Sequence, residues 1–456
     1  MTREHKLKIM PGTGPAYRTV TARDFRKLPQ LQGFPRERLR AMELVAKVLP
    51  FKSNNYVVEK LIDWDNPLED PIFHLTFPQP SMLRPEHLSQ VRDAAASHDA
   101  ERLRETVHRI RVELNPHPAG QIHKNVPRLR DGTRLTGMQH KYAETVLFFP
   151  SQGQTCHAYC TFCFRWPQFV HLDGLKFAMR EADLLVRYLR EHPEVTDVLF
   201  TGGDPMIMRA KVLRTYLEAL AEADLPHVRT IRIGTKAISY WPYRFISDED
   251  TPELMAALRG VIDHGRHLAI MAHVNHPKEL GTPEAEEAVA NLRALGAEIR
   301  TQSPLMRRIN DSPEIWAEMW RRQVNLGMVP YYMFVARDTG AQHYFAVPLV
   351  RAWEIYSAAA RQVSGLARTV RGPSMSCTPG KVEVTGVAHV YGRKVLALRM
   401  LQGRNPEWAY RPFFAEYDET AIWLDDLRPA FGEPRFFFEE EETGLGGGED
   451  PAVAVA

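Results

Sequence analysis

The sequence is poor in cysteine: four occur in 456 residues, and three of them lie within one short stretch. This excludes a disulfide framework and is typical of a protein from a reducing compartment. No apolar stretch reaches the roughly 18 to 20 residues that span a bilayer, and the first residues lack the apolar core of a signal peptide. The net charge is only +2, which does not indicate nucleic acid or an acidic membrane surface as a partner. We therefore expect a cytoplasmic protein that binds neither nucleic acid nor a membrane.

The length and composition indicate a globular chain of two or three domains. Hydrophobic residues make up 44% and charged residues 25% of the chain, and a chain of this size can bury a sizeable core. Residues 1–140 have apolar positions three or four apart and several prolines, which predicts a mostly helical N-terminal domain. The first 50 residues carry 11 Lys and Arg against 4 Asp and Glu. This excess indicates either a docking arm for an acidic partner or, as we favour, solvated helix faces.

From about residue 143 the pattern changes to a regular alternation of short apolar runs and amphipathic stretches. Six runs are strand-like: Thr145–Pro150, Val195–Phe200, Val228–Gly234, His267–Val274, Ala297–Ser303 and Val329–Val335. A helical stretch follows each of them, over 180–192, 209–224, 251–264, 283–295, 313–326 and 347–364. Such alternation predicts parallel βαβ units, and six units are too few for the closed eight-fold barrel. The α/β fold expected for 141–372 is therefore a partial six-unit (β/α) barrel with ligands at the carboxyl ends of its strands.

The last part of the chain predicts a small C-terminal extension over 373–438, with a β-like stretch at Val382–Val395. The aromatic run from Phe436 to Phe438 is expected to pack against a neighbouring segment. Residues 439–456 are acidic and rich in glycine, a composition typical of a disordered tail.

Three cysteines form the pattern Cys-x3-Cys-x2-Cys just after the first apolar run. Cys156, Cys160 and Cys163 can converge on one metal centre, and thiolate clusters suit iron–sulfur or zinc. Zinc would need a fourth protein ligand, for which His157 is available. Three cysteines alone leave one position open, as an iron–sulfur cluster with a substrate-like ligand requires. The remaining alternative is that the cysteines are simply buried. Phe162 completes the pattern Cys-x3-Cys-x-aromatic-Cys.

This pattern resembles that of the radical S-adenosylmethionine (SAM) superfamily. The resemblance implies a [4Fe–4S] cluster on the three cysteines, with SAM bound at its open iron near Phe162. One electron, from a donor such as flavodoxin or ferredoxin, cleaves SAM to a 5′-deoxyadenosyl radical, while the protein orients the cofactor and excludes water. The second apolar run ends in Gly202, Gly203 and Asp204, a motif that the resemblance assigns to the amino group of SAM. Paired glycines allow close approach of a ligand, although Gly-Gly-Asp is also a common turn.

Motifs at the ends of the later runs resemble one branch, the lysine 2,3-aminomutase family. In chain order the motifs are Arg165 after the cysteines, Gly202–Asp204, Arg232–Thr235, His273–Pro277, Gln302–Ser303, Asn310–Asp311 and Pro330–Tyr332. The resemblance covers about 138–385, over half of the chain. By this resemblance Thr235, His273, Gln302 and Tyr331 contact cofactor. Read without the family, a single His near an apolar strand is more often a hydrogen-bonded core residue.

The family resemblance further implies an enzyme that uses pyridoxal 5′-phosphate (PLP) to move an amino group between adjacent carbons of an amino-acid-like substrate. The matching positions make Lys381 the lysine that holds PLP and Lys141 a cofactor contact. They make Arg165 the partner of the substrate carboxylate, since an arginine offers two parallel donors. The alternative for Lys381 is an exposed lysine after a Pro-Gly turn. The family also implies a homo-oligomer.

The chain departs from the family around PLP. Of two arginines expected at the phosphate, one is Lys141 and the other is Thr145, and the tyrosine expected at 334 is Phe334. A radical SAM enzyme that abstracts hydrogen without PLP is therefore an open alternative. A second, of another class, is a non-catalytic iron–sulfur or zinc protein that keeps the barrel for binding. The complete set of cysteine, Gly-Gly-Asp, His and Gln positions favours an enzyme, a radical SAM isomerase.

The chain also departs from the family where lysine-specific members bind their substrate. Those members use two aspartates for the side-chain ammonium. Here the first position is Arg337, followed by Asp338, and the second is near Ser374. An ammonium without a counter-charge is unfavourable in a barrel mouth. Free lysine is therefore not the expected substrate, unless Asp338 reaches it.

Overall fold

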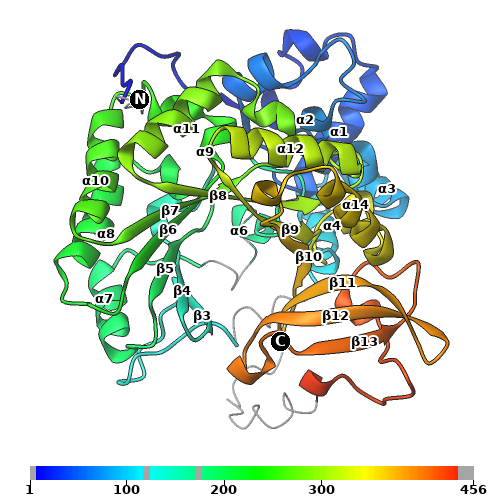
Figure 1. The fold of residues 1–456 in the computed structure, drawn as a ribbon. Coiled ribbons are helices and arrows are strands. Elements are labelled where there is room, and N and C mark those ends of the chain that lie inside the picture. The colour runs from blue at the N-terminus through cyan, green and yellow to red at the C-terminus, as the bar shows by residue number, and fades with distance from the viewer. Residues whose placement is uncertain (1–6, 117–123, 171, 173–176, 440–456) are drawn as a thin grey trace.

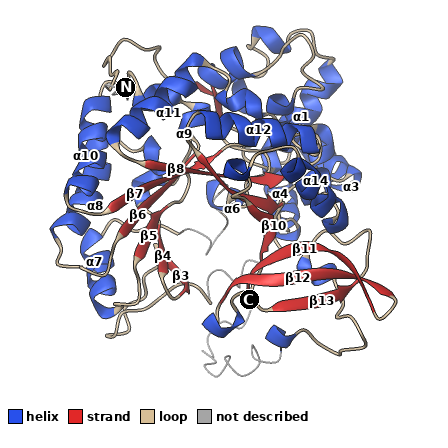
Figure 2. Ribbon diagram, viewed as in Figure 1, coloured by secondary structure: helices blue, strands red, loops and turns tan. Residues whose placement is uncertain are grey.

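The computed structural model describes residues 7–116, 124–170, 172 and 177–439. The expected disordered tail over 439–456 lies outside these residues, apart from Glu439. Eleven strands form one sheet in the order β13-β12-β11-β10-β9-β8-β7-β6-β5-β4-β3, so each strand neighbours the next in the chain. Figure 2 shows this sheet as a curved surface with helices along its outer side.

The centre of the sheet consists of parallel strands that coincide with the six expected runs. These strands are β4 (Thr145–Phe148), β5 (Asp197–Phe200), β6 (Thr230–Thr235), β7 (His267–His273), β8 (Glu298–Leu305) and β9 (Val329–Val335). Each pairs in parallel with the next. The α/β class with a parallel sheet is thus confirmed. Because parallel strands run in one direction, their carboxyl ends lie along the same edge.

The helices between these strands begin and end close to the expected positions. They are α7 (Ala182–Glu191), α8 (Ala210–Glu222), α10 (Thr251–Asp263), α11 (Pro283–Leu295), α12 (Pro313–Asn325) and α14 (Leu349–Arg361). The signals are local: Thr282 Oγ1 accepts from Ala285 N (3.1 Å) at the start of α11, and Gly296 ends that helix at φ +103°. Short helices α6 (Trp166–Phe169), α9 (Ala237–Tyr240) and α13 (Gln342–Phe345) follow β4, β6 and β9. No helix within the described ranges has the length and apolar character to cross a bilayer.

Beyond β9 the sheet gains one more parallel strand and then antiparallel ones. β10 (Arg371–Ser376) runs parallel to β9, and β11 (Gly380–Val390), β12 (Arg393–Gly403) and β13 (Pro412–Glu416) follow antiparallel. At the other edge, β3 (Met138–Tyr142) is antiparallel to β4. The β-like stretch expected at Val382–Val395 is therefore two strands. Tyr391 and Gly392, at φ +48° and +73°, form the turn between them, and two-residue hairpin turns need positive φ at both positions.

The aromatic residues near the end of the described chain cover this antiparallel part. Phe436 and Phe438 pack on Phe413 of β13, with ring centroids 5.3 and 5.7 Å apart. The run packs against a neighbouring strand, as its composition suggested.

The N-terminal region packs against the segments that follow the carboxyl ends of the parallel strands. It contains α1 (Arg36–Val48), α2 (Pro71–Thr76), α3 (Pro85–Ala96), α4 (Ala100–Glu113) and the strand pair β1 (Thr19–Val20) and β2 (Ser53–Asn54). Its buried side chains share one hydrophobic cluster with Ala158, Trp166 and Tyr240, which stand beyond the expected boundary at residue 140. Figure 1 shows its helices, in blue, beside α12 and α14. The region and the cysteine loop therefore have a common core.

Candidate active site

The cysteine loop follows β4 and is held in place by the N-terminal region. Lys52 Nζ donates to the carbonyl of Cys156 (2.7 Å). Tyr17 Oη and Asn54 Nδ2 both donate to the carbonyl of His157 (2.6 and 3.2 Å). These donors lie 103 to 140 positions away in the sequence, so no local pattern could have revealed them. They fix the backbone on which the three cysteines stand.

The three cysteines lie on this loop, and each residue is half-buried. Cys160 Sγ lies 3.6 Å from the hydroxyl of Tyr240 at the end of α9. Among the described residues, no three His, Cys, Asp or Glu side chains are placed to hold a single metal ion, and this includes His157 with the cysteines. An iron–sulfur cluster is wider than one ion. The assignment of Cys156, Cys160 and Cys163 to a cluster therefore stays a prediction.

The paired glycines after β5 are needed by the chain itself. Gly202 has φ +141°, and a Cβ there would lie 2.4 Å from Gln154 Nε2. A Cβ on Gly203 would lie 2.4 Å from the carbonyl oxygen of Thr155. The expected reason for these glycines was close approach of a ligand. The structure gives a nearer reason, because the segment that enters the cysteine loop occupies the space in which side chains would stand.

Asp204 and Thr235 bind each other across the ends of β5 and β6. The Asp204 carboxylate accepts from Thr235 Oγ1 (2.9 Å), Lys236 N (2.8 Å) and Met206 N (2.9 Å). Burial raises the pKa of Asp204 above its usual value, and these hydrogen bonds oppose that shift. Both residues were predicted to contact cofactor. That role stays a prediction, and in the structure these bonds hold the two strand ends together.

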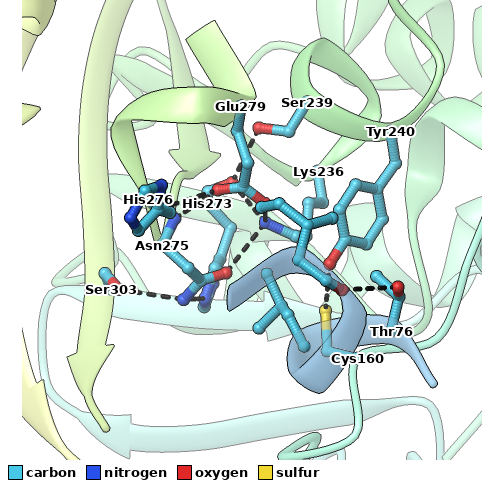
Figure 3. A network of polar contacts seen from close by, with 12 residues as sticks. Thr76, Cys160, Lys236, Ser239, Tyr240, His273, Asn275, His276, Glu279 and Ser303 are labelled. Carbon is cyan, nitrogen blue, oxygen red and sulfur yellow. Dashed lines mark hydrogen bonds and ion pairs between the residues drawn. The ribbon is translucent and has the colours of Figure 1, made fainter. Parts of the chain in front are cut away.

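A buried ion pair lies beside the cysteine loop, and the sequence did not reveal it. Lys236 Nζ donates to Glu279 Oε1 (2.5 Å), Asn275 Oδ1 (2.8 Å) and the carbonyl of His273 (3.2 Å), as Figure 3 shows. The Lys236 side chain is 10% exposed and that of Glu279 is 0% exposed. Lys236 Nζ also lies 4.3 Å from the ring centroid of Tyr240. Tyr240 therefore contacts both the Lys236 ammonium and Cys160, a predicted cluster ligand.

The charge of Lys236 acts on the cysteine end of the site. Burial raises the pKa of the Cys160 thiol to about 12, and the positive charge of Lys236 is the largest opposing influence. A cation at this position favours the thiolate, which is the form that binds metal. The lysine and its glutamate are separated by 43 positions, so only the fold brings them together.

His273 stands between the cysteine loop and β8. Its ring stacks on Phe162 with centroids 5.6 Å apart, and its Nε2 meets Asn275 Nδ2 at 3.1 Å. Asn275 Nδ2 also donates to Ser303 Oγ (2.8 Å). Burial lowers the pKa of His273 well below its usual value, so the ring is neutral and accepts at Nε2. Gln302 of β8 pairs with His273 in the sheet register. The fold thus brings Phe162, His273 and Gln302 together, as the motif order predicted.

Lys381 lies on β11 among aromatic rings. Its Nζ donates to Gln402 Oε1 (3.2 Å) and lies 4.3 Å from the ring centroid of Tyr332, with Phe334 at 5.8 Å and Tyr142 at 5.9 Å. Tyr332 and Phe334 share one face of β9 because side chains alternate along a strand. The alternative of an exposed lysine after a turn is therefore wrong: Lys381 is partly buried.

The expected cofactor contact Tyr331 does not touch Lys381. Its ring lies under the guanidinium groups of Arg300 (5.1 Å) and Arg371 (4.5 Å). Tyr332, one position later, is the tyrosine next to Lys381. The motif was placed on the right strand, and the sheet register decides which tyrosine faces the lysine.

Three cations surround Lys381. Burial and the charges of Arg371, Arg232 and Lys141 lower the pKa of Lys381 to about 7. Like charges close together disfavour a further proton. A lysine with this pKa is present in part as the neutral amine near pH 7, which is the nucleophilic form.

The same cations fit a phosphate group. Lys141 Nζ donates to the carbonyl of Cys377, and Arg232 Nη2 donates to Thr145 Oγ1 (3.4 Å) and Nε to Asp197 (2.7 Å). Thr145, where the family has an arginine, thus lies against an arginine from β6. Arg371 lies on another strand near the same lysine, and Arg232 adds a positive group that Asp197 partly offsets; cations of this kind suit the phosphate of PLP.

Arg165 follows the cysteines and contains an unsatisfied donor. Its Nη1 is buried and has no hydrogen-bond partner. The guanidinium lies 4.5 Å from the ring centroid of Phe149 and 5.1 Å from that of Phe164. Burial lowers the pKa of Arg165 to about 10, and the neighbouring Arg337 adds to the shift. A buried donor without a partner is costly, so this group fits a carboxylate ligand.

Comparison with known proteins gives several relatives, although no protein-family model matches the chain. A protein of Aquifex aeolicus named "Putative L-lysine 2,3-aminomutase" is 31% identical over 87% of this chain and 92% of its own length. The proteins named "L-lysine 2,3-aminomutase" from Fusobacterium nucleatum and Clostridium subterminale are 30% and 29% identical over 51% of this chain, which spans 51% and 52% of their length. Among solved structures, Streptococcus suis SuiB bound to S-adenosylmethionine matches 57% of this chain and 49% of that chain at 14% identity with a TM-score of 0.34. That likeness is too weak to carry an argument.

Proposed function

The chain belongs to the lysine 2,3-aminomutase family of radical SAM proteins, and we propose that it cleaves SAM at a [4Fe–4S] cluster. We propose further that, with PLP, it moves an amino group between adjacent carbons of an amino-acid-like substrate other than free lysine. The observation that carries the proposal is Lys381, a lysine of pKa about 7 beside aromatic rings and a group of cations. We further propose that the reducing electron comes from a donor such as flavodoxin or ferredoxin, and that the protein works as a homo-oligomer.

At the cysteine end, Cys156, Cys160 and Cys163 would hold the cluster. When bound, the cluster and SAM supply the radical that removes a hydrogen atom from the substrate. The chain supports this end through the Lys236 charge and through the stacked rings of Phe162 and His273, which offer a flat apolar surface. The N-terminal region holds the loop in place with hydrogen bonds.

At the lysine end, Lys381 would hold PLP, and Lys141, Arg232 and Arg371 would hold its phosphate. When bound, PLP supplies the conjugated system over which an unpaired electron spreads. The rings of Tyr332 and Phe334 are stacked with centroids 4.8 Å apart and provide the apolar wall. Arg165 would orient the substrate through its carboxylate.

Free lysine is disfavoured by the residues at the two substrate positions. Ser374 donates its hydroxyl to the carbonyl of Met333 (3.4 Å) and is buried. Arg337 is a cation, and Asp338, a carboxylate beside it, accepts from Arg337 Nε at 3.3 Å. The carboxylate next to these positions is therefore already paired, so the desolvation of a substrate ammonium there is poorly compensated.

The test is covalent trapping on the anaerobically purified, cluster-reconstituted chain. PLP is added, the sample is reduced with borohydride, and peptides are mapped by mass. We expect the PLP mass on Lys381, absent in Lys381→Ala and retained in Lys394→Ala, since Lys394 is an exposed lysine on the neighbouring strand β12.

A parallel assay separates the alternatives. Release of 5′-deoxyadenosine after anaerobic reduction, without any adduct on Lys381, would identify a PLP-free radical enzyme. A reconstituted cluster that neither cleaves SAM nor accepts PLP would identify a non-catalytic binding protein.

A further inference from the structure

Two arginines border the ring of Phe164, the residue between the last cysteine and Arg165. The guanidinium carbons of Arg165 and Arg337 lie 5.1 and 5.4 Å from its centroid. The two side chains come from different segments, the cysteine loop and the end of β9. Two like charges at one ring repel each other, and an anion placed against them relieves this repulsion. Asp338 is one such anion, 3.3 Å from Arg337 Nε.

Arg337 is well covered and has donors to spare. Its side chain is 25% exposed, and its guanidinium also lies 5.6 Å from the ring of Trp423 in the C-terminal extension. Its Nε donates to Asp338, as described above. Within the described residues, its two Nη groups have no hydrogen-bond partner. Asp338 and Asp425, the carboxylates that act on nearby Cys377, both have interactions of their own.

The cations assigned to the phosphate do not include Arg337. The charges that act on Lys381 are those of Arg371, Arg232 and Lys141, whereas Arg337 lies with Arg165 at the ring of Phe164. The two positive groups adjoin each other, since Lys141 and Arg337 both act on Cys377. One surrounds the lysine, and the other faces the position proposed for the substrate.

We propose that the substrate is an α-amino acid whose side chain ends in a carboxylate, with Arg165 binding the α-carboxylate and Arg337 the side-chain carboxylate. This assignment rests on the proposed function and specifies its substrate class. Each guanidinium gains a charge-assisted, two-pronged partner, and the mutual repulsion of the arginines is relieved. A side chain ending in an ammonium would meet Arg337 as a like charge, and a neutral amide would give Arg337 no anionic partner beyond Asp338.

The proposal is tested by calorimetric titration of the reconstituted, PLP-loaded chain without reductant. The probes are L-glutamate, L-aspartate, L-glutamine and L-lysine. We expect one of the two dicarboxylates to bind at least about tenfold more tightly than glutamine or lysine, as one charge-assisted hydrogen-bonding pair implies. Arg337→Gln is expected to weaken dicarboxylate binding about ten- to a hundredfold and to leave glutamine binding unchanged. Arg165→Gln should weaken all amino acids.

Controls make each outcome decisive. Arg337→Lys keeps the charge and should keep the preference, and Arg351→Gln removes an exposed arginine on α14 and should change nothing. Thermal melting shows whether Arg337→Gln is folded. Lysine or glutamine binding as tightly as the dicarboxylates, no binding of any probe, or an unchanged preference in Arg337→Gln would overturn the proposal. If PLP fails to attach to Lys381, the proposed function fails instead, and the titration without PLP still measures the preference set by Arg337.

Discussion

The two ends of the candidate site are built in opposite ways. At the cysteine end, all three predicted ligands come from one stretch of eight residues, Cys156 to Cys163. At the lysine end, the cations come from four strands: Lys141 from β3, Arg232 from β6, Arg371 from β10 and Lys381 from β11. The first end can be found in the sequence as a motif. The second exists only when the sheet is formed.

The difference follows from the range of the forces involved. A metal ligand must stand at bonding distance, so its spacing in the sequence is strict. A charge acts over several ångströms, so an anion site can lose one residue and gain another from a different strand. Thr145 illustrates this, because the arginine expected there is absent while Arg232 lies against it. The departures from the family motif thus make the proposed PLP site harder to recognise in the sequence, while other strands still place cations there.

The largest expected effect comes from replacing a cysteine, and the two ends of the site should respond differently. Cys160→Ala should abolish cluster reconstitution, measured as bound iron and sulfide, and with it the release of 5′-deoxyadenosine. Cys377→Ala, at a buried cysteine near the lysine end, should leave iron content unchanged. Equal iron in both variants would contradict the assignment of the cluster to the loop.

The next effect concerns the buried ion pair at the cysteine end. Lys236→Met should lower the free energy of unfolding by about 3–5 kcal/mol, because it leaves Glu279 buried without a partner. Denaturant unfolding of the purified chain measures this. Lys60→Met breaks the more exposed pair with Glu284 (3.2 Å) and should cost about 1 kcal/mol or less. The double variant Lys236→Met with Glu279→Gln should recover part of the loss; no recovery would mean that the pair is not the cause.

A smaller effect tests the glycines that were assigned to a ligand. Gly203→Ala should destabilise the chain by about 1–3 kcal/mol, since its Cβ would overlap the carbonyl of Thr155. Gly260→Ala in α10 has open space around it and should be neutral or stabilise the chain by up to about 1 kcal/mol. Thermal unfolding compares the two. If Gly203→Ala does not destabilise the chain, close approach of a ligand would be the better reason for this glycine.

The smallest effect is a shift in pH dependence at the lysine end. The rate of PLP capture by Lys381 should rise as pH increases through about 7 and then level off, because the neutral amine is the reactive form. Arg371→Gln removes a neighbouring positive charge, which lets the pKa of Lys381 rise toward its ordinary value by on the order of one unit. The midpoint of the profile should therefore move to higher pH. Borohydride trapping at a series of pH values measures it, and an unmoved midpoint would show that Arg371 does not act on Lys381.

The alternating runs and helices were predictable because their signals are local. Period and capping residues such as Thr282 are read within a few positions of where they act. The hairpin at Tyr391 and Gly392 was missed because the pattern over Val382–Val395 indicates one β-like stretch, although Gly392 is a residue that favours turns. The choice between Tyr331 and Tyr332 depends on strand register, which a one-residue shift reverses.

By itself, the sequence determined the cysteine loop and the order of the parallel strands. These features depend on neighbours along the chain. Only the tertiary structure decided that Lys52 and Asn54 hold the cysteine loop, that Lys236 pairs with Glu279, and that Arg337 stands beside Arg165. Such contacts depend on which strand ends meet at the common edge of the sheet, and pairwise spacing in the sequence carries no record of that.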